Sequence, residues 1–251
     1  MIEIFILSLI QGITEFLPIS SSSHLILASK YLSFENQSLS IDVSLHIGSF
    51  IGVICYFFKD IKDFFKNKVL FFQILISSLP VMFVGYILVE ANLIDRIRNI
   101  KVIAWTTIIF GVLLYISDKF KLEKNIEKLN YKSAVIIGVF QILSLIPGVS
   151  RSGIAITAAR LLNFRRVDAA KISFLLSIPI LGAVSIFGLK NIILTKSIDY
   201  TSINLFAVLT AFIFSYLTIK YFLKYISKFS LNIFVSYRIL LGLILLMITY
   251  L

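Results

Sequence analysis

Cysteine is almost absent from this chain, and so are long polar stretches. Cys55 is the only cysteine, which excludes an intrachain disulfide. The longest polar stretch, 118–132, is a basic loop, and no segment has the composition of a soluble domain. The N-terminal residues Met1-Ile2-Glu3 lack the positively charged flank of a signal peptide, so we expect them to remain on the mature protein.

Acidic residues are also scarce, because 13 Asp and Glu stand against 24 Lys and Arg, for a formal net charge of +11. In a soluble protein this excess would indicate nucleic-acid binding. Here the cations lie in short loops between apolar runs, where positive charge sets the orientation of membrane helices. We therefore expect membrane lipids as partners, and no nucleic acid.

Apolar residues, in contrast, make up 59% of the 251 residues, and crossing a bilayer takes roughly 20 of them in a row. Six runs are predicted to span the membrane: about 40–58, 69–89, 102–117, 172–190, 203–219 and 233–250. Two further apolar regions, 2–31 and 133–160, are interrupted by polar residues. Each is too long for one span and too broken for two, so we predict that each forms a re-entrant helical hairpin. The predicted fold class is an all-α polytopic integral membrane protein.

The loop charges orient this layout. The segments 59–68, 118–132, 160–171 and 220–230 hold 16 Lys and Arg, whereas the opposite loops hold six: Lys30, Arg96, Arg98, Lys101, Lys190 and Lys196. The preference for positive charge in the cytoplasm then places both termini outside it. The first hairpin would enter from outside, and the second from the cytoplasmic face. Arg151 and Arg238 remain inside apolar runs, and we expect Arg238 to extend to the cytoplasmic interface.

A weak internal repeat joins the two halves of the chain. The residues from Gln11 to Ser22 are echoed by those from Gln141 to Ser152, and Ile76–Pro80 by Leu176–Pro179. We predict one membrane domain with repeats at about 1–117 and 133–251, joined by the basic loop 118–132. Because the two hairpins enter from opposite sides, the repeat has inverted topology, and such folds place their site near the midplane between broken helices.

The first polar signature runs from Gln11 to His24. Gln11 and Glu15 are four residues apart, so they share one face of a helix that Pro18 would end. The serines Ser20–Ser23 follow, and serine is a favoured helix N-cap. A second half-helix is therefore predicted to start there and to carry His24.

Ser21 and His24 would lie three residues apart near the first turn of that half-helix. A hydroxyl beside an imidazole is the minimum for an activated nucleophile or an acid–base pair. Glu15 could orient the imidazole, act as a base or bind a divalent cation, since carboxylate oxygens suit Mg²⁺ and Ca²⁺. The alternative is that Glu15 and His24 are structural groups paired in a packed bundle.

The second polar signature is Pro147-Gly148-Val149-Ser150-Arg151-Ser152-Gly153. Pro147-Gly148 breaks the chain, and the free N–H groups of a new half-helix after it favour an anion. Arg151 adds a planar guanidinium that matches phosphate oxygens, and the hydroxyls of Ser150 and Ser152 supply further donors. The alternative role of Arg151 is an ion pair with Glu15 that joins the hairpins, which is compatible with phosphate binding.

Three other residues are candidates for supporting roles. Asp42 and His46 are four residues apart on the first full span, so they could face the same cavity. His46 is a candidate donor behind the site, and a structural role is an equal alternative. Thr157 lies six residues after Arg151, on a different turn, where it could bond only its own helix backbone.

At these residues the chain resembles the undecaprenyl-diphosphate phosphatases of the bacitracin-resistance family. That family shows [Glu/Gln]-x-x-x-Glu running into Phe-Leu-Pro-[Ile/Val]-Ser-Ser and a histidine, which matches Gln11 to His24. Its Pro-Gly-x-Ser-Arg-Ser-Gly matches Pro147 to Gly153. Its Asp/Glu-x-x-x-Gln/His-x-Gly and Phe-Leu-Leu-x-x-Pro segments resemble residues 42–48 and 174–179. Similar residues run along nearly the whole chain.

The resemblance implies hydrolysis of undecaprenyl diphosphate to undecaprenyl phosphate and inorganic phosphate, supported by a divalent cation. This reaction recycles the lipid carrier of cell-wall precursors at the outer face of the bacterial inner membrane. The resemblance also implies an inverted repeat with two re-entrant hairpins. The catalytic positions that match are Glu15, Ser21, His24 and Arg151, with Gln11 and Ser150 close by.

Three positions depart from the family's pattern. Gln11 stands where many members have glutamate, so a metal site would have one carboxylate fewer. Ser23 replaces a common glycine just before the histidine, and Ala155 stands where many members carry threonine. These departures bear on cation affinity and on the phosphate contacts.

The sequence leaves the attacking group open among Ser21, His24 and a water activated by Glu15 or His24. The competing function is transport of a polyprenyl phosphate, because inverted repeats with broken helices are typical of secondary transporters. A transporter needs no activated nucleophile, so the group of Glu15, Ser21 and His24 favours an enzyme. The oligomeric state also stays open, with a homodimer as one candidate.

Overall fold

The computed structural model describes residues 1–32, 38–64, 68–91, 93, 98–120, 124–194 and 202–250. Over these residues the fold is all-α, apart from an isolated bridge between Lys124 and Phe164. The α-helices are α1 (Ile2–Thr14), α2 (Ser21–Leu32), α3 (Leu39–Tyr56), α4 (Phe58–Phe64), α5 (Lys68–Glu90), α7 (Ile100–Asp118), α8 (Tyr131–Ile142), α9 (Arg151–Leu161), α10 (Arg166–Leu194), α11 (Ser202–Ile226) and α12 (Asn232–Tyr250). Two short 3-10 helices are η1 (Ile126–Lys128) and η2 (Leu143–Leu145).

Six of these helices are long and apolar enough to cross a membrane, at the places that the sequence predicts: α3, α5, α7, α10, α11 and α12. The chain is therefore an all-α, multi-pass membrane protein. Three segments expected as loops are helical instead, because residues 58–64 form α4, α10 already begins at residue 166, and α11 continues to residue 226. Of the residues used in the charge layout, 65–67, 96, 121–123 and 196 lie outside the described residues.

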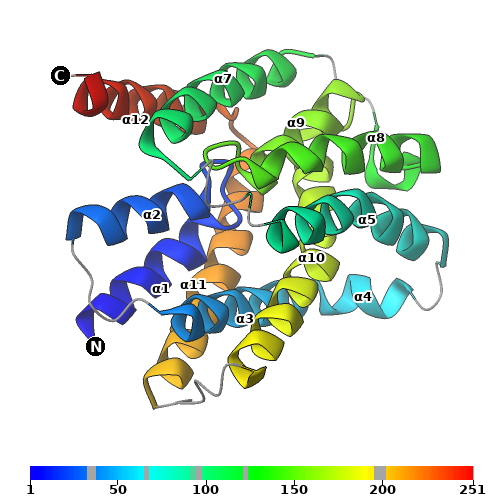
Figure 1. The fold of residues 1–251 in the computed structure, drawn as a ribbon. Coiled ribbons are helices and arrows are strands. Elements are labelled where there is room, and N and C mark those ends of the chain that lie inside the picture. The colour runs from blue at the N-terminus through cyan, green and yellow to red at the C-terminus, as the bar shows by residue number, and fades with distance from the viewer. Residues whose placement is uncertain are drawn as a thin grey trace.

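The helices α1, α2, α8 and α9 are too short to span a bilayer. They have 11 to 13 residues each, which makes each roughly 20 Å long at most, against a hydrocarbon core of about 30 Å. In Figure 1 the α1–α2 pair and the α8–α9 pair occupy opposite ends of the bundle, and their connecting loops meet near its centre. This arrangement suits two hairpins that enter from opposite sides. Re-entry into a membrane and the division into repeats remain predictions.

Each hairpin turns at a serine with a left-handed backbone conformation. Ser20 has φ 75° and directly precedes α2, and Ser150 has φ 73° and directly precedes α9. Such conformations are costly for a residue with a side chain, and they collect at functional sites. Gly148 has φ 93°, and a Cβ there would lie 2.0 Å from Thr106 Oγ1. The second break therefore requires glycine at this position.

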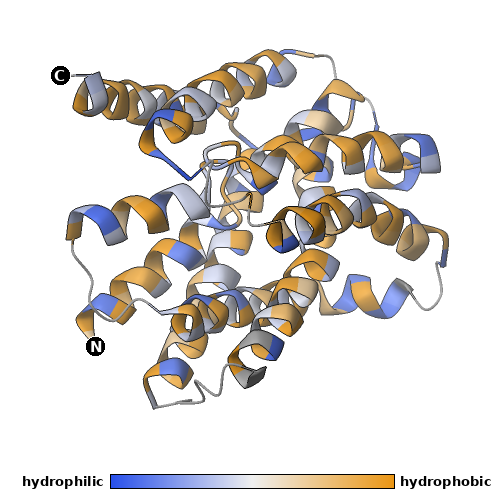
Figure 2. Ribbon diagram, viewed as in Figure 1, coloured by the Kyte–Doolittle hydropathy of each residue, from blue (hydrophilic) through white to orange (hydrophobic). Residues whose placement is uncertain are grey.

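The helices of the two halves interleave. The contacts place α11 on α1 and α3, α8 on α5, and α12 along α7. Small residues allow the close approach: a Cβ on Gly48 of α3 would lie 2.4 Å from Val208 O in α11, and one on Gly138 of α8 would lie 2.6 Å from Ser77 O. Figure 2 shows apolar colour along most of the helices, with hydrophilic residues gathered at helix ends and on α4.

The similar proline-containing segments Ile76–Pro80 and Leu176–Pro179 do not lie on corresponding helices of the two halves. Pro80 lies within α5, the second spanning helix of the first half, whereas Pro179 lies within α10, the first spanning helix of the second half. This part of the sequence similarity therefore lends no support to the predicted repeat.

Arg238 is fully buried, and the prediction that it extends to the interface is wrong. It donates to the backbone carbonyls of Thr107, Pro18, Gly148 and Val149 at 2.8 to 3.2 Å. The helix breaks expose carbonyl groups that have no helical partner, and these groups satisfy a guanidinium inside the bundle.

Two cations that the sequence assigned to a cytoplasmic loop are part of a buried cluster. Asp118 lies 2.9 Å from Arg160 Nη2 and 2.8 Å from Arg166 Nε, and it also accepts from the backbone N–H of Leu231 at 3.2 Å. One carboxylate thus ties the end of α7 to α9, to the start of α10 and to the start of α12. This ionic cluster lies where α7 and α9 end.

Candidate active site

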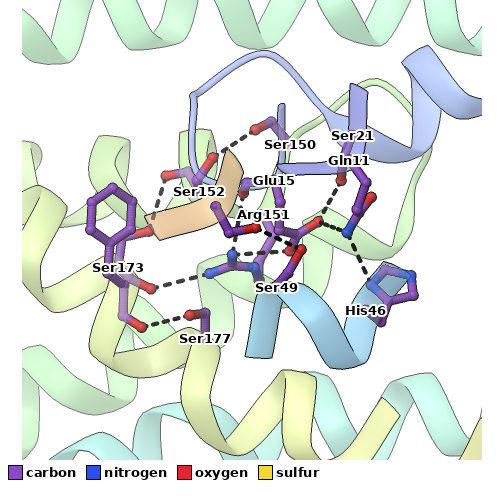
Figure 3. A network of polar contacts seen from close by, with 12 residues as sticks. Gln11, Glu15, Ser21, His46, Ser49, Ser150, Arg151, Ser152, Ser173 and Ser177 are labelled. Carbon is purple, nitrogen blue, oxygen red and sulfur yellow. Dashed lines mark hydrogen bonds and ion pairs between the residues drawn. The ribbon is translucent and has the colours of Figure 1, made fainter. Parts of the chain in front are cut away.

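The two hairpin loops bring Glu15, just after α1, against Arg151, the first residue of α9. Arg151 Nη2 lies 3.1 Å from Glu15 Oε1 and 3.3 Å from the Glu15 carbonyl oxygen, and Arg151 Nη1 donates to Ser173 O in α10. The two side chains are only 11% and 7% exposed. The ion pair between the hairpins, which the sequence gave as the alternative role of Arg151, is therefore present (Figure 3).

Glu15 Oε2 accepts two further hydrogen bonds. Ser21 Oγ donates to it at 2.6 Å and Gln11 Nε2 at 3.1 Å. This confirms that Gln11 and Glu15 share one face. The Gln11 amide also lies 3.2 Å from His46 Nδ1 on α3, so His46 reaches the cluster through Gln11. Figure 3 shows Gln11 and Ser21 directed at Glu15, with His46 on α3 reaching Gln11 from the other side.

His24 lies on α2 as expected but has other partners than Ser21. Its Nδ1 lies 2.7 Å from Ser20 O and its Nε2 lies 2.6 Å from Tyr237 Oη on α12. The two rings stack with an interplanar angle of 13°. The hydroxyl–imidazole pair expected from their spacing is not formed, because the Glu15 carboxylate is a stronger acceptor for Ser21. With Nδ1–H donating to the carbonyl, Nε2 is the basic nitrogen and accepts from Tyr237.

The start of α9 has the features of an anion site. Ser150 is its N-cap, and its hydroxyl accepts from the N–H of Gly153 at 3.1 Å. Arg151 follows, so the positive end of the helix dipole and a guanidinium lie together. Ser152 Oγ donates to Leu17 O at 2.6 Å and lies 3.2 Å from Ser150 Oγ. The Ser152 hydroxyl thus joins the two hairpins.

Two buried polar atoms of this cluster, Gln11 Oε1 and Arg151 Nε, have no hydrogen-bond partner among the described residues. The first is an oxygen that could bind a cation, and the second is a donor that could bind an anion. The described part of the chain contains no group of three or more His, Cys, Asp or Glu that could hold a metal ion. One carboxylate and one amide oxygen are too few to hold a cation alone, so a cation bound by Glu15 and Gln11 would need further ligands, such as substrate phosphates or water.

The other candidate residues differ in how closely they join this cluster. Thr157 Oγ1 donates to Gly153 O of its own helix at 2.8 Å, which agrees with the sequence interpretation. Asp42 lies in the first turn of α3 and is half-buried. The sequence did not predict that Ser173, Tyr237 and Arg238 contact residues at or near the site. A lone arginine in an apolar run was the only sequence signal, and it was assigned to the interface.

The chain is similar to proteins of one family over most of its length. A family model described as "Bacitracin resistance protein BacA" matches residues 4–244. A Pelagibacter ubique protein named "Undecaprenyl-diphosphatase" is 49% identical over 99% of this chain and 98% of its own length. "Undecaprenyl-diphosphatase 1" of Pseudoalteromonas translucida is 41% identical over 96% of both chains. The "Undecaprenyl-diphosphatase" of Jannaschia sp. is 38% identical over 98% of both.

Proposed function

This chain belongs to the bacitracin resistance protein BacA family, and we propose that the contact between its two helix breaks is the active site of the family's phosphatase. The reaction is hydrolysis of undecaprenyl diphosphate to undecaprenyl phosphate and inorganic phosphate. The chain is thus a multi-pass membrane hydrolase with a polyprenyl diphosphate substrate. Transport of a polyprenyl phosphate, the competing function, is not favoured by the names of the relatives.

The observation that carries the assignment of the site is the meeting of Glu15 and Arg151 from different hairpins. Phosphoryl transfer needs positioning and charge stabilisation more than covalent help. Arg151 Nε and the N-terminal end of α9 would hold the terminal phosphate and stabilise the charge that develops on it. Ser150 lies at the same helix end and would add a hydroxyl.

For the attacking group, we propose Ser21 with Glu15 as its base, because Ser21 Oγ donates to the carboxylate at 2.6 Å. Ser21 Oγ attacks the terminal phosphorus, its proton passes to Glu15, and the bond from phosphorus to the bridging oxygen breaks. Undecaprenyl phosphate leaves, and water then hydrolyses the phosphoserine to release inorganic phosphate. Attack by His24 would instead leave phosphohistidine, and direct attack by water would leave no phosphoenzyme.

A divalent cation, Mg²⁺ or Ca²⁺, would be held by Glu15 and the free Gln11 oxygen. When bound, such a cation withdraws negative charge from phosphate oxygens. Among the described residues only one carboxylate, that of Glu15, lies at this place, so we expect affinity for the cation to depend strongly on the bound substrate.

The isoprenoid tail would lie in an apolar groove that begins beside the site. The groove has a volume of about 430 Å³ and runs along α11, lined among others by Ile13, Leu17, Phe214, Tyr221 and Phe234. Leu17 also accepts the hydrogen bond from Ser152, so the groove and the anion site share this residue. We further propose that the protein lies in the bacterial plasma membrane and that the site opens to the outer face, in keeping with the loop charges.

The test is phosphate release from farnesyl or undecaprenyl diphosphate by purified protein in detergent, which abolishes vectorial transport. Glu15→Ala and Arg151→Ala should each lower kcat/KM by at least about 100-fold, the usual scale for removing a base or an oxyanion-stabilising group. A chelator should abolish turnover, and added Mg²⁺ or Ca²⁺ should restore it. Wild-type turnover in both variants would defeat the site assignment.

Rapid quenching during turnover tests the proposed attacking group. Acid-stable phosphoserine at Ser21 is expected, and Ser21→Ala should remove it. Acid-labile phosphohistidine would transfer the role to His24. A phosphoenzyme absent at every time point would favour attack by water.

A further inference from the structure

We propose that Arg238 is a positioning residue for the phosphatase reaction, which holds the two hairpin breaks at the spacing at which Glu15 and Arg151 meet. It touches neither of them among the recorded contacts. It acts through the backbone that leads into each half of the site. The inference rests on the proposed function, because the reaction is its readout.

The contacts of Arg238 connect three parts of the chain. Its Nη1 donates to Pro18 O in the first break, at 3.1 Å. Its Nη2 donates to Gly148 O and Val149 O in the second break, at 2.8 and 3.1 Å. One guanidinium therefore spans both loops, each within three residues of Ser21 or Arg151. Its Nε donates to Thr107 O at 3.2 Å, which anchors the group to α7.

No carboxylate within the described part of the chain is paired with Arg238. Its side chain is fully buried, and none of the ion pairs within the described residues involves it. Such a charge is costly inside a membrane protein and marks function by default. Arg160, also fully buried, differs in this respect, because Asp118 lies 2.9 Å from it. An apolar residue would fill the site of Arg238 more cheaply, but it would leave the three break carbonyls, those of Pro18, Gly148 and Val149, without this donor.

The orientation of these carbonyls also determines where the N–H groups of the same peptides point, and these N–H groups belong to the anion site. The described residues contain no cis peptide bond, so the N–H of Ser150 points opposite to the Val149 carbonyl. Because Arg238 holds that carbonyl, the N–H of Ser150 is turned away from Arg238. The positive φ of Ser150 follows directly and starts α9 with Arg151. Loss of the guanidinium would free this peptide to rotate.

The experiment compares Arg238→Lys with Arg160→Lys, a matched change in an equally buried arginine at the far end of α9. Both variants are purified in detergent, and thermal unfolding, kcat, KM and the inhibition constant for inorganic phosphate are measured. A purely structural loss lowers the active fraction but leaves KM and the inhibition constant unchanged. Arg238→Lys should weaken inhibition by phosphate about tenfold and lower kcat/KM about 100-fold, the scale expected for a displacement of about 1 Å. Arg160→Lys should leave both binding constants unchanged.

A second variant keeps the proposal testable if Arg238→Lys does not fold. A Cβ on Gly111 of α7 would lie 3.1 Å from Arg238 Cβ, with Arg238 Nε next at 3.6 Å. Gly111→Ala therefore crowds Arg238 without removing its charge, and alanine is favoured in a helix. It should weaken phosphate inhibition several-fold. Gly85→Ala, whose Cβ would meet only the end of Leu145 at 3.3 Å, is the control.

The outcomes separate the two claims. Wild-type turnover together with unchanged phosphate inhibition in Arg238→Lys, or in Gly111→Ala where the former does not fold, overturns the positioning role and leaves the proposed function standing. A wild-type protein that releases no phosphate overturns both.

Discussion

Glu15 accepts hydrogen bonds on both of its carboxylate oxygens, and this determines what the residue can do. Arg151 donates to Oε1, whereas Ser21 and Gln11 donate to Oε2. An ionised carboxylate accepts from all three donors without presenting an O–H of its own, which a protonated carboxyl would do. In the proposed mechanism the residue would therefore act as a base towards Ser21, and its charge is balanced by Arg151.

At the same scale, we predict that Tyr237→Phe lowers kcat several-fold without unfolding the protein. The change removes the donor to His24 Nε2 while it keeps the stacked ring, and one hydrogen bond is worth about 1 kcal/mol. The stacked ring and the hydrogen bond to the Ser20 carbonyl would then be left to orient His24.

Steady-state kinetics in detergent would measure this effect, with Tyr216→Phe on α11 as the control, because Tyr216 packs only against aromatic rings in its recorded contacts. Equal kcat in the two variants would mean that Tyr237 does not orient His24 for the reaction.

Among the elements, the two breaks decide where the chemistry can be placed. A continuous helix presents neither free N–H groups nor free carbonyls in its middle, whereas each break here presents both. The carbonyls of the two breaks face Arg238, and α9 begins directly afterwards with its N-terminal end at the cluster. The half-helices are thus the means by which polar backbone reaches the interior of a membrane protein.

At the scale of the element, we predict that Gly148→Ala destabilises the protein by roughly 3 kcal/mol, from overpacking and from strain at positive φ together. A Cβ there would lie 2.0 Å from Thr106 Oγ1 and 2.8 Å from Ile103 O, so the second break would have to move off α7. Thermal unfolding in detergent measures the loss, with Gly85→Ala as a matched change. A melting temperature equal to that of the control would contradict the strained-break interpretation.

Across the whole molecule, helices from one half complete the packing of the other. α11 covers α1 and α3, and α8 packs on α5, so neither hairpin is held by its own half alone. At the α4 end of the bundle, Asp118 ties α7, α9, α10 and α12 together. The Glu15–Arg151 contact is therefore a product of the complete bundle rather than of either half.

The topology gives a prediction at this scale. In a Cys55→Ser background, Lys30→Cys at the exposed end of α2 should react with a membrane-impermeant maleimide in intact cells. Lys228→Cys, exposed just after α11, should react only after lysis, because the distribution of loop charge predicts a cytoplasmic position for it. The opposite labelling pattern would invert the proposed orientation and close the site to the outer face.

The amino-acid sequence alone determined the class of the protein, its six spanning helices and the two broken segments. Long apolar runs leave a chain few alternatives to spanning helices, and proline, glycine and serine mark a break locally. Glu15, Ser21, Arg151 and Ser150 could be identified as candidate site residues, because each belongs to a short polar signature in apolar sequence.

Only the tertiary structure decided which hydrogen-bond partner each of these side chains has. Ser21 bonds to Glu15 rather than His24, His24 bonds to Tyr237, and Arg238 turns inward to the breaks instead of outward to the interface. These contacts join residues up to 220 positions apart, and no local pattern encodes which acceptor a buried donor will reach. That choice depends on how the helices of the two halves interleave, because their packing determines which unsatisfied groups face one another.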